Sequence, residues 1–122
     1  MLETLTYGCL VVTVLITGYY ALIFVRDPEA ALDIATHRRD LLPQVMAGRY
    51  VVVFLLALGA LVFNNVAVAA YFFAVCTFLG LYDGWVYRRN GLPHFKHTIT
   101  GLLALGALCI ALLALTSSGD AA

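Results

Sequence analysis

The feature that most constrains this chain is a set of long uncharged runs separated by short polar segments. Residues 5–25 and residues 98–118 contain no Asp, Glu, Lys or Arg. Each run matches the about 20 helical residues that cross the hydrocarbon core of a bilayer. Only 11% of the 122 residues are charged and 63% are hydrophobic, whereas a soluble domain carries about 25% charged residues. The sequence therefore predicts an all-α integral membrane protein.

The central uncharged run, residues 50–82, is too long for one membrane span and contains a turn signal. Its 33 residues include the pair Asn64–Asn65, which is typical of a tight turn. The parts before and after the Asn pair are each too short to cross the bilayer unless they extend beyond the uncharged run. The second helix must therefore include Arg49, and the third must include Asp83. We predict a four-helix bundle forming a single transmembrane domain over residues 1–122, with spans at about 5–25, 45–63, 66–87 and 97–116.

The first connection, residues 27–42, is polar but contains helix signals. Asp27 followed by Pro28 is typical of a helix start, with Asp as the N-cap and Pro at the first helical position. Alanines and scattered apolar residues follow. We predict a short amphipathic helix on the cytoplasmic membrane surface, with the basic residues 37–39 at its C-terminal end.

The distribution of basic residues predicts the orientation of the chain. Lys and Arg number seven, as do Asp and Glu, so there is no net positive charge for binding nucleic acid. By the positive-inside rule, the first and third connections are cytoplasmic and both termini extracytoplasmic, in a multi-pass protein of the bacterial inner membrane. All the basic residues lie in or beside these two connections: Arg26, Arg38, Arg39, Arg49, Arg88, Arg89 and Lys96.

Asp83 is the first candidate for a functional residue, because an acidic side chain inside a membrane helix is costly unless it is paired or faces water. Arg49 and His97 are predicted at the same cytoplasmic end, and four aromatic residues are expected to line a pocket there: Tyr50, Tyr82, Trp85 and Tyr87. Three interpretations remain open: a ligand or proton-exchange site, a structural ion pair of Asp83 with Arg49, and a solvated Asp at the interface. No catalytic residue is identified.

Other cofactors and partners are weaker alternatives. His94 and His97 have a spacing that can place two imidazoles on one helix face, as for a divalent metal; haem and quinone are further alternatives, and no cofactor is predicted. Small residues at three- and four-residue spacing, including Gly80 and Gly84, favour close helix packing. Such packing is compatible with a compact bundle within one chain, with a homodimer and with a larger membrane complex.

The order of the polar residues resembles that of a known group. The segment Met46-Ala47-Gly48-Arg49 opens one span, Asp83 ends the next, Gly91 lies in the turn, and His97-Thr98-Ile99-Thr100-Gly101 opens the last. Over residues 40–115 this resembles small four-helix bacterial and fungal membrane proteins of unknown function, loosely DoxX-like. The resemblance implies a four-helix membrane fold and a shortlist of Arg49, Asp83 and His97.

Two functions follow as hypotheses. The first is an accessory or binding protein for a lipid-like or quinone-like molecule, with the polar cluster at the cytoplasmic end of the bundle. The second is a membrane enzyme or proton-coupled carrier that uses Asp83 and His97 on a small hydrophobic substrate.

Overall fold

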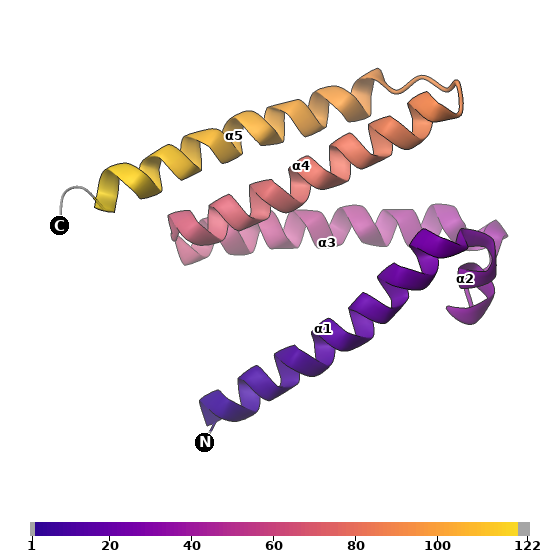
Figure 1. Cartoon of the computed structure of the whole chain (residues 1–122), viewed down its shortest axis with the longest axis horizontal. Helices are drawn as coiled ribbons and strands as arrows, with labels where there is room; N and C mark the ends of the chain where they lie inside the picture. Colours follow the sequence, from indigo (N-terminus) through magenta and orange to yellow (C-terminus); the bar gives the residue numbers. More distant parts are fainter. Residues whose placement is uncertain (1, 120–122) are drawn as a thin grey trace. The chain divides into compact units, whose positions relative to one another are not determined.

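The computed structural model describes residues 2–119, with the side chains of residues 2–8, 10, 11, 14, 118 and 119 left out. The described residues are helical and contain no strand, which confirms the all-α prediction. The elements are α1 (Leu2–Arg26), α2 (Pro28–Ile34), the 3-10 helix η1 (Arg39–Leu41), α3 (Leu42–Phe63), α4 (Val66–Arg89) and α5 (Phe95–Gly119) (Figure 1).

Three helical segments in the described residues are long and apolar enough to cross a membrane: Arg39–Phe63, Val66–Arg89 and Phe95–Ser117. A shorter apolar stretch covers Leu15–Arg26. This is the pattern of a multi-pass membrane protein. The side chain of Glu3 and all of Asp120 lie outside the described part.

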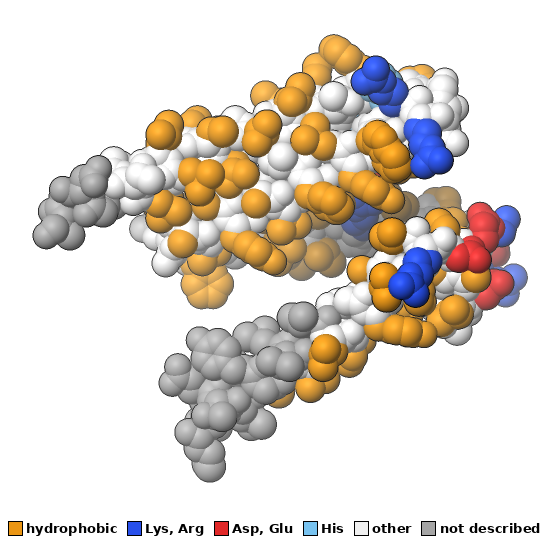
Figure 2. All heavy atoms as spheres, in the orientation of Figure 1, with side chains coloured by type: hydrophobic (Ala, Val, Ile, Leu, Met, Phe, Trp, Pro, Cys, Tyr) orange, Lys and Arg blue, Asp and Glu red, His pale blue; other side chains and the backbone are white. Residues whose placement is uncertain are grey.

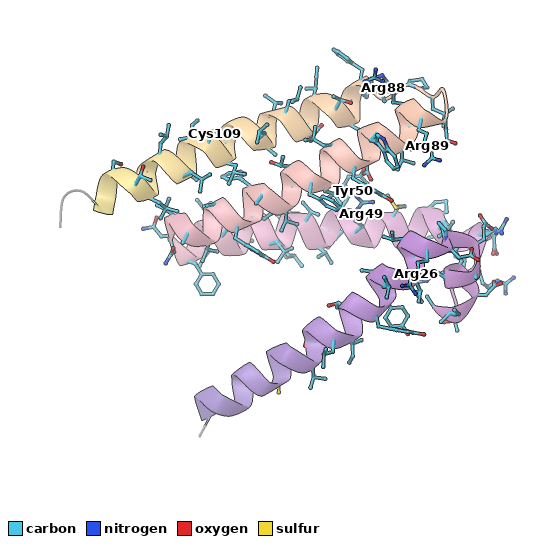
Figure 3. All side chains as sticks on the ribbon, viewed as in Figure 1. Arg26, Arg49, Tyr50, Arg88, Arg89 and Cys109 are labelled. Atoms are coloured by element: carbon cyan, nitrogen blue, oxygen red, sulfur yellow. The ribbon has the colours of Figure 1, made fainter. Side chains whose placement is uncertain are left out.

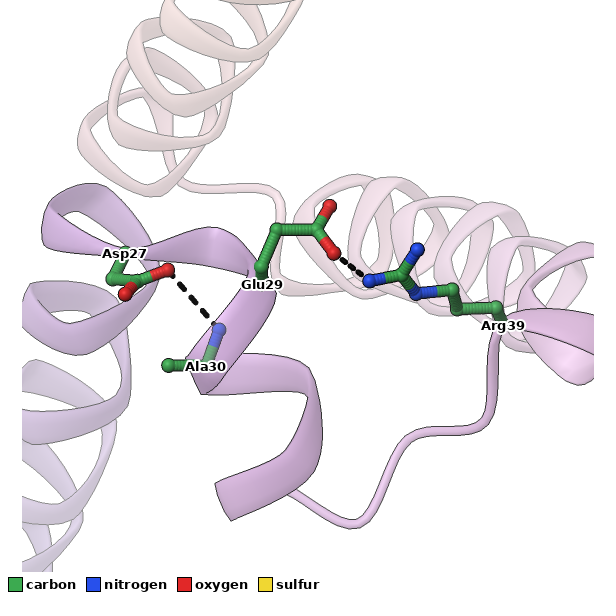
Figure 4. Close-up of polar contacts among 4 residues, drawn as sticks. All are labelled: Asp27, Glu29, Ala30 and Arg39. Atoms are coloured by element: carbon green, nitrogen blue, oxygen red, sulfur yellow. Dashed lines mark hydrogen bonds and ion pairs between the residues drawn. The ribbon is translucent and has the colours of Figure 1, made fainter.

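The chain divides into two compact units, residues 1–49 and residues 50–122. In the first unit, α2 begins as predicted: Asp27 is its N-cap and accepts a hydrogen bond from the backbone N–H of Ala30 at 3.1 Å (Figure 4). Ala31 on α2 is only 1% exposed, and α2 packs against α1. Glu29 and Arg39 form an ion pair between exposed side chains.

One detail of this connection differs from the prediction. Helix α2 ends at Ile34, so its last turn contains no basic residue. Thr36 has a left-handed backbone with φ of 57°, which diverts the chain before His37, Arg38 and Arg39 are reached. The basic residues therefore lie beyond α2, and Arg39 begins η1 instead.

In the second unit, the Asn pair forms the predicted turn between α3 and α4. Asn64 has φ of 48°, a left-handed conformation that Asn tolerates better than most residues. The side chain of Asn65 caps α4 by accepting hydrogen bonds from the N–H groups of Ala67 and Val68. Helix α3 begins before Val45 and α4 extends past Tyr87, as the length argument required.

Helices α4 and α5 form an antiparallel hairpin with extensive contact (Figure 1). The buried residues of α4 recur at heptad-like intervals, which is the spacing of closely packed helices. They are Ala70, Thr77, Gly80 and Gly84, and α5 contributes Gly101 and Ala111.

Large apolar side chains lie on the surface of this hairpin rather than inside it. Leu103 and Ile110 of α5 are each 71% exposed, and Tyr71 of α4 is 75% exposed. Figure 2 shows hydrophobic side chains over much of the hairpin's length. Small residues inside and large apolar residues outside are what a lipid environment favours, because lipid offers no hydrophobic drive for large side chains to be buried.

Candidate functional site

The end of the α4–α5 hairpin that contains its connecting loop, residues 80–101, is called here the loop end. Helix α4 closes with Asn90, whose side chain donates a hydrogen bond to the carbonyl of Val86 at 2.8 Å. Gly91 follows with φ of 68°, a left-handed conformation that glycine adopts without steric cost. This turn returns the chain within a few residues, so the end of α4 and the start of α5 lie side by side.

Glycines bring the two backbones together at the loop end. A Cβ atom added to Gly80 would lie 2.6 Å from the backbone nitrogen of Gly101, and one added to Gly84 would lie 2.6 Å from Oγ1 of Thr98. The glycine pair predicted to mediate close packing is therefore used within the chain, between α4 and α5. It fixes the register in which polar groups from the two helices meet.

Asp83, Tyr87 and His97 lie on one flank of this crossing, called here the acidic flank. At about 100° per residue in a helix, Asp83 projects on the opposite side of the Gly80–Gly84 line from Leu81. Asp83 is half-buried. Tyr87 lies one turn further along α4, and its ring centroid is 4.6 Å from that of His97 on α5. His97 is also half-buried, and its carbonyl oxygen lies 3.2 Å from the Cβ position of Gly80.

The other flank of the crossing, called here the basic flank, contains a small cavity of about 170 Å³. His94 Nδ1 lies 3.1 Å from Oγ1 of Thr98, and that hydroxyl donates to the carbonyl oxygen of His94 at 3.2 Å. Arg88 comes from the last turn of α4 (Figure 3). The cavity is lined by Leu81, Gly84, Trp85, Arg88, His94 and Thr98.

Aromatic side chains form a ladder along α4. The rings of Phe78 and Tyr82 stack at 5.6 Å, and Tyr82 lies 5.9 Å from Trp85. The guanidinium of Arg89 is 5.4 Å from the centre of the Trp85 ring, a cation–π distance. These side chains are exposed. Of the aromatic residues expected in the pocket, Tyr87 contacts His97.

Arg49 and Tyr50 lie on α3, where the boundary between the two units falls. Arg49 is half-buried and Tyr50 is 63% exposed. Arg49 ends the first unit and Asp83 belongs to the second, so their pairing stays a prediction.

The two histidines of the loop end have different neighbours. His94 contacts Thr98 and His97 contacts Tyr87. Within the described residues, no group of three or more His, Cys, Asp or Glu side chains is arranged to hold a metal ion. The structure thus adds no further ligand to the pair considered as a metal site.

Sequence reasoning identified neither Thr98 nor Arg88 as a site residue. A usable signal was present, because Gly80 and Gly84 on α4 and Gly101 on α5 predict a close crossing. Aligning that crossing in an antiparallel hairpin places Thr98 next to Gly84.

Comparisons with protein-family models, curated proteins and solved structures find no match for this chain. The resemblance to DoxX-like proteins therefore stays an expectation from the sequence.

Proposed function

We propose that this chain is a four-span membrane protein that binds a lipid-like or quinone-like amphiphile, with the amphiphile's polar part at the acidic flank. Asp83 and His97 hold that polar part, and Arg49 completes the cluster from α3. In this proposal α1 is the fourth span, both termini are extracytoplasmic, and the membrane is a bacterial inner membrane.

The observation that supports this proposal is the position of two ionisable side chains within a helix crossing. Asp83 and His97 are half-buried and belong to helices that are otherwise apolar enough to cross a membrane. Ionisable groups in such helices are costly and usually serve a function. Gly80 and Gly84 lie beside them, and the Tyr87 ring contacts His97, so the flank combines polar groups with an aromatic wall.

The length of α1 supports a fourth span. It runs over 25 residues, or about 37 Å at 1.5 Å per residue, which exceeds the about 30 Å of a hydrocarbon core. Its sequence has no charged residue between Glu3 and Arg26. Four spans place the first and third connections on the same side, together with all the basic residues.

The second candidate function uses the same flank. An acid and an imidazole at one helix crossing are the groups that exchange protons in membrane enzymes and carriers. In this alternative, Asp83 and His97 transfer a proton to or from a small hydrophobic substrate. Both groups are half-buried, which is as compatible with proton transfer as with binding of an amphiphile. A measurement of substrate turnover, rather than the geometry, therefore distinguishes the two functions.

The test begins with the full chain purified in a mild detergent. Mass spectrometry of the co-purified small molecules, with a visible spectrum, identifies the amphiphile and detects haem or quinone. We expect Asp83→Asn to retain the fold and its thermal stability while losing at least about ten-fold of the bound molecule, since a charge-assisted hydrogen bond contributes about 1.5–3 kcal/mol.

A double-mutant cycle separates this proposal from a purely structural ion pair. In the structural case, Asp83→Asn and Arg49→Leu each destabilise the protein and the double variant recovers stability. Such recovery, with unchanged retention of the small molecule, contradicts the proposal.

A further inference from the structure

The cavity of the basic flank is a second site that the proposed function does not use, with Arg88, His94 and Thr98 set in a mostly apolar wall. It lies on the opposite side of the Gly80–Gly84 line from Asp83 and contains no carboxylate among its six lining residues. Its volume of about 170 Å³ corresponds to about six water molecules at roughly 30 Å³ each. A phosphate group with its ester oxygens fits this space.

The side chains of the cavity are suited to an anion. Arg88 carries five N–H donors in a planar fork that matches phosphate oxygens. The Thr98 hydroxyl donates to the His94 carbonyl and lies 3.1 Å from His94 Nδ1, so Thr98 holds the ring through that nitrogen. Nε2 is the ring nitrogen that this contact does not use, and when it carries a proton it is a further N–H donor.

The charges around the cavity reinforce this preference. Arg89 and Lys96 lie next to its walls in sequence, and Figure 2 shows blue side chains at the loop end of the hairpin. The acidic residue of this region, Asp83, lies on the other flank. The local field at the basic flank is therefore positive.

The cavity also changes in polarity along its length. Arg88 and His94 lie nearest the loop, whereas Leu81 lies seven residues back along α4, or about 10 Å at 1.5 Å per residue. Trp85 lies between these two ends. A polar end at the membrane boundary and an apolar end toward the middle of the span follow the order of a membrane lipid, with its phosphate outside and its acyl chains inside.

We propose that this cavity binds the phosphate of an anionic glycerophospholipid, with Arg88 and His94 on the phosphate and Leu81 and Trp85 along the start of the acyl chains. Thr98 is a positioning residue, because it holds the His94 ring through Nδ1. The site is distinct from the acidic flank, so the two proposals fail independently.

The test uses the full chain in nanodiscs of phosphatidylcholine doped with phosphatidic acid, and native mass spectrometry measures the phosphatidic acid retained. Two adjacent arginines provide a matched pair: Arg88→Gln removes a cavity charge, and Arg89→Gln removes an equal charge from the exposed ladder. We expect about ten-fold weaker retention for Arg88→Gln and a change within about two-fold for Arg89→Gln. Equal losses in the two variants would show diffuse attraction to the membrane and overturn the proposal.

A second pair of variants tests the positioning role of Thr98 and controls for misfolding. Thr98→Val removes the hydroxyl that holds His94, whereas Thr100→Val removes an exposed hydroxyl that bonds only to the carbonyl of Lys96. We expect about three-fold weaker retention for Thr98→Val and no change for Thr100→Val, with unchanged helical content and thermal unfolding in both. Unchanged retention in Thr98→Val contradicts the role of Thr98.

Competition with inorganic phosphate distinguishes a lipid ligand from a soluble anion. We expect phosphate added to the nanodiscs to leave the bound phosphatidic acid in place, because the apolar end of the cavity contributes only to the lipid. Displacement by inorganic phosphate with the same dependence on Arg88 would identify a soluble-anion site and overturn the assignment to a lipid.

Discussion

The two turns of the second unit differ in how they join their helices. At the α4–α5 loop, glycines bring the backbones into contact and leave only a cavity of about 170 Å³ that includes Arg88 and His94. At the Asn64–Asn65 turn, residues of α3 and α4 line a wider cavity of about 430 Å³, and none of its lining residues is charged. Both turns are short, so turn length does not explain the difference.

The difference follows from the residues next to each turn. Phe72 and Phe73 line the wider cavity together with alanines, and no glycine is among its lining residues. At the loop end, Gly80, Gly84 and Gly101 allow α4 and α5 to pack closely. This close packing brings polar groups of the two helices together. Glycine contacts between backbones and ionisable residues thus coincide at the loop end of α4, whereas the cavity at the Asn turn is lined by neither glycine nor an ionisable residue.

The largest expected effect comes from blocking the glycine crossing. Gly80→Ala places a Cβ 2.6 Å from a backbone nitrogen of α5, so the helices must separate, and we expect a loss of about 3 kcal/mol in the free energy of unfolding. The control is Gly106→Ala on α5, where the new Cβ meets nothing within 4 Å. Denaturation of the full chain in mixed micelles measures both; equal stability of the two variants would show that the crossing is not close.

A pair of neighbouring alanines compares the tight and the wide packing directly. Ala70 is 6% exposed, and Ala70→Leu is expected to cost about 2 kcal/mol by overpacking. Ala69 lines the wide cavity, so Ala69→Leu has space and should change stability by less than about 0.5 kcal/mol. The same micelle denaturation measures the pair, and a larger loss at Ala69 than at Ala70 would reverse the comparison.

The smallest expected effects concern the backbone of the turns themselves. Gly91 has φ of 68°, so Gly91→Ala should cost about 1 kcal/mol, because alanine is strained there. Asn64 has φ of 48°, and Asn64→Gly should change stability by less than about 0.5 kcal/mol, because glycine accepts this conformation. Thermal unfolding followed by circular dichroism compares them; a neutral Gly91→Ala would contradict the left-handed turn.

Much of the fold could be predicted from the sequence because charge and length set strict limits in a membrane. The 33 uncharged residues around Asn64–Asn65 required two helices that extend past Arg49 and Asp83, and α3 and α4 do so. The end of α2 could not be predicted in this way. A left-handed residue at Thr36 is set by local contacts rather than by hydropathy.

The site was predicted less completely, because the sequence indicates depth in the membrane but not the direction of a side chain. Asp83 and His97 were expected at one end, and the helix crossing places both at the loop end of the hairpin. Which aromatic residue meets His97 depends on the register fixed by Gly80 and Gly101, and this register selects Tyr87. The same register creates the cavity beside Thr98, which no spacing within a single helix reveals.

The most direct test of the central claim, that the loop end rather than the Asn turn binds the amphiphile's polar part, is photo-crosslinking of the full chain. The probe is an amphiphile with its photoreactive group next to the polar part, and peptide mass spectrometry locates the label. We expect labelling within residues 80–101, reduced in Asp83→Asn. Labelling concentrated in residues 57–73, around the wide apolar cavity, and unaffected by Asp83→Asn, would contradict it.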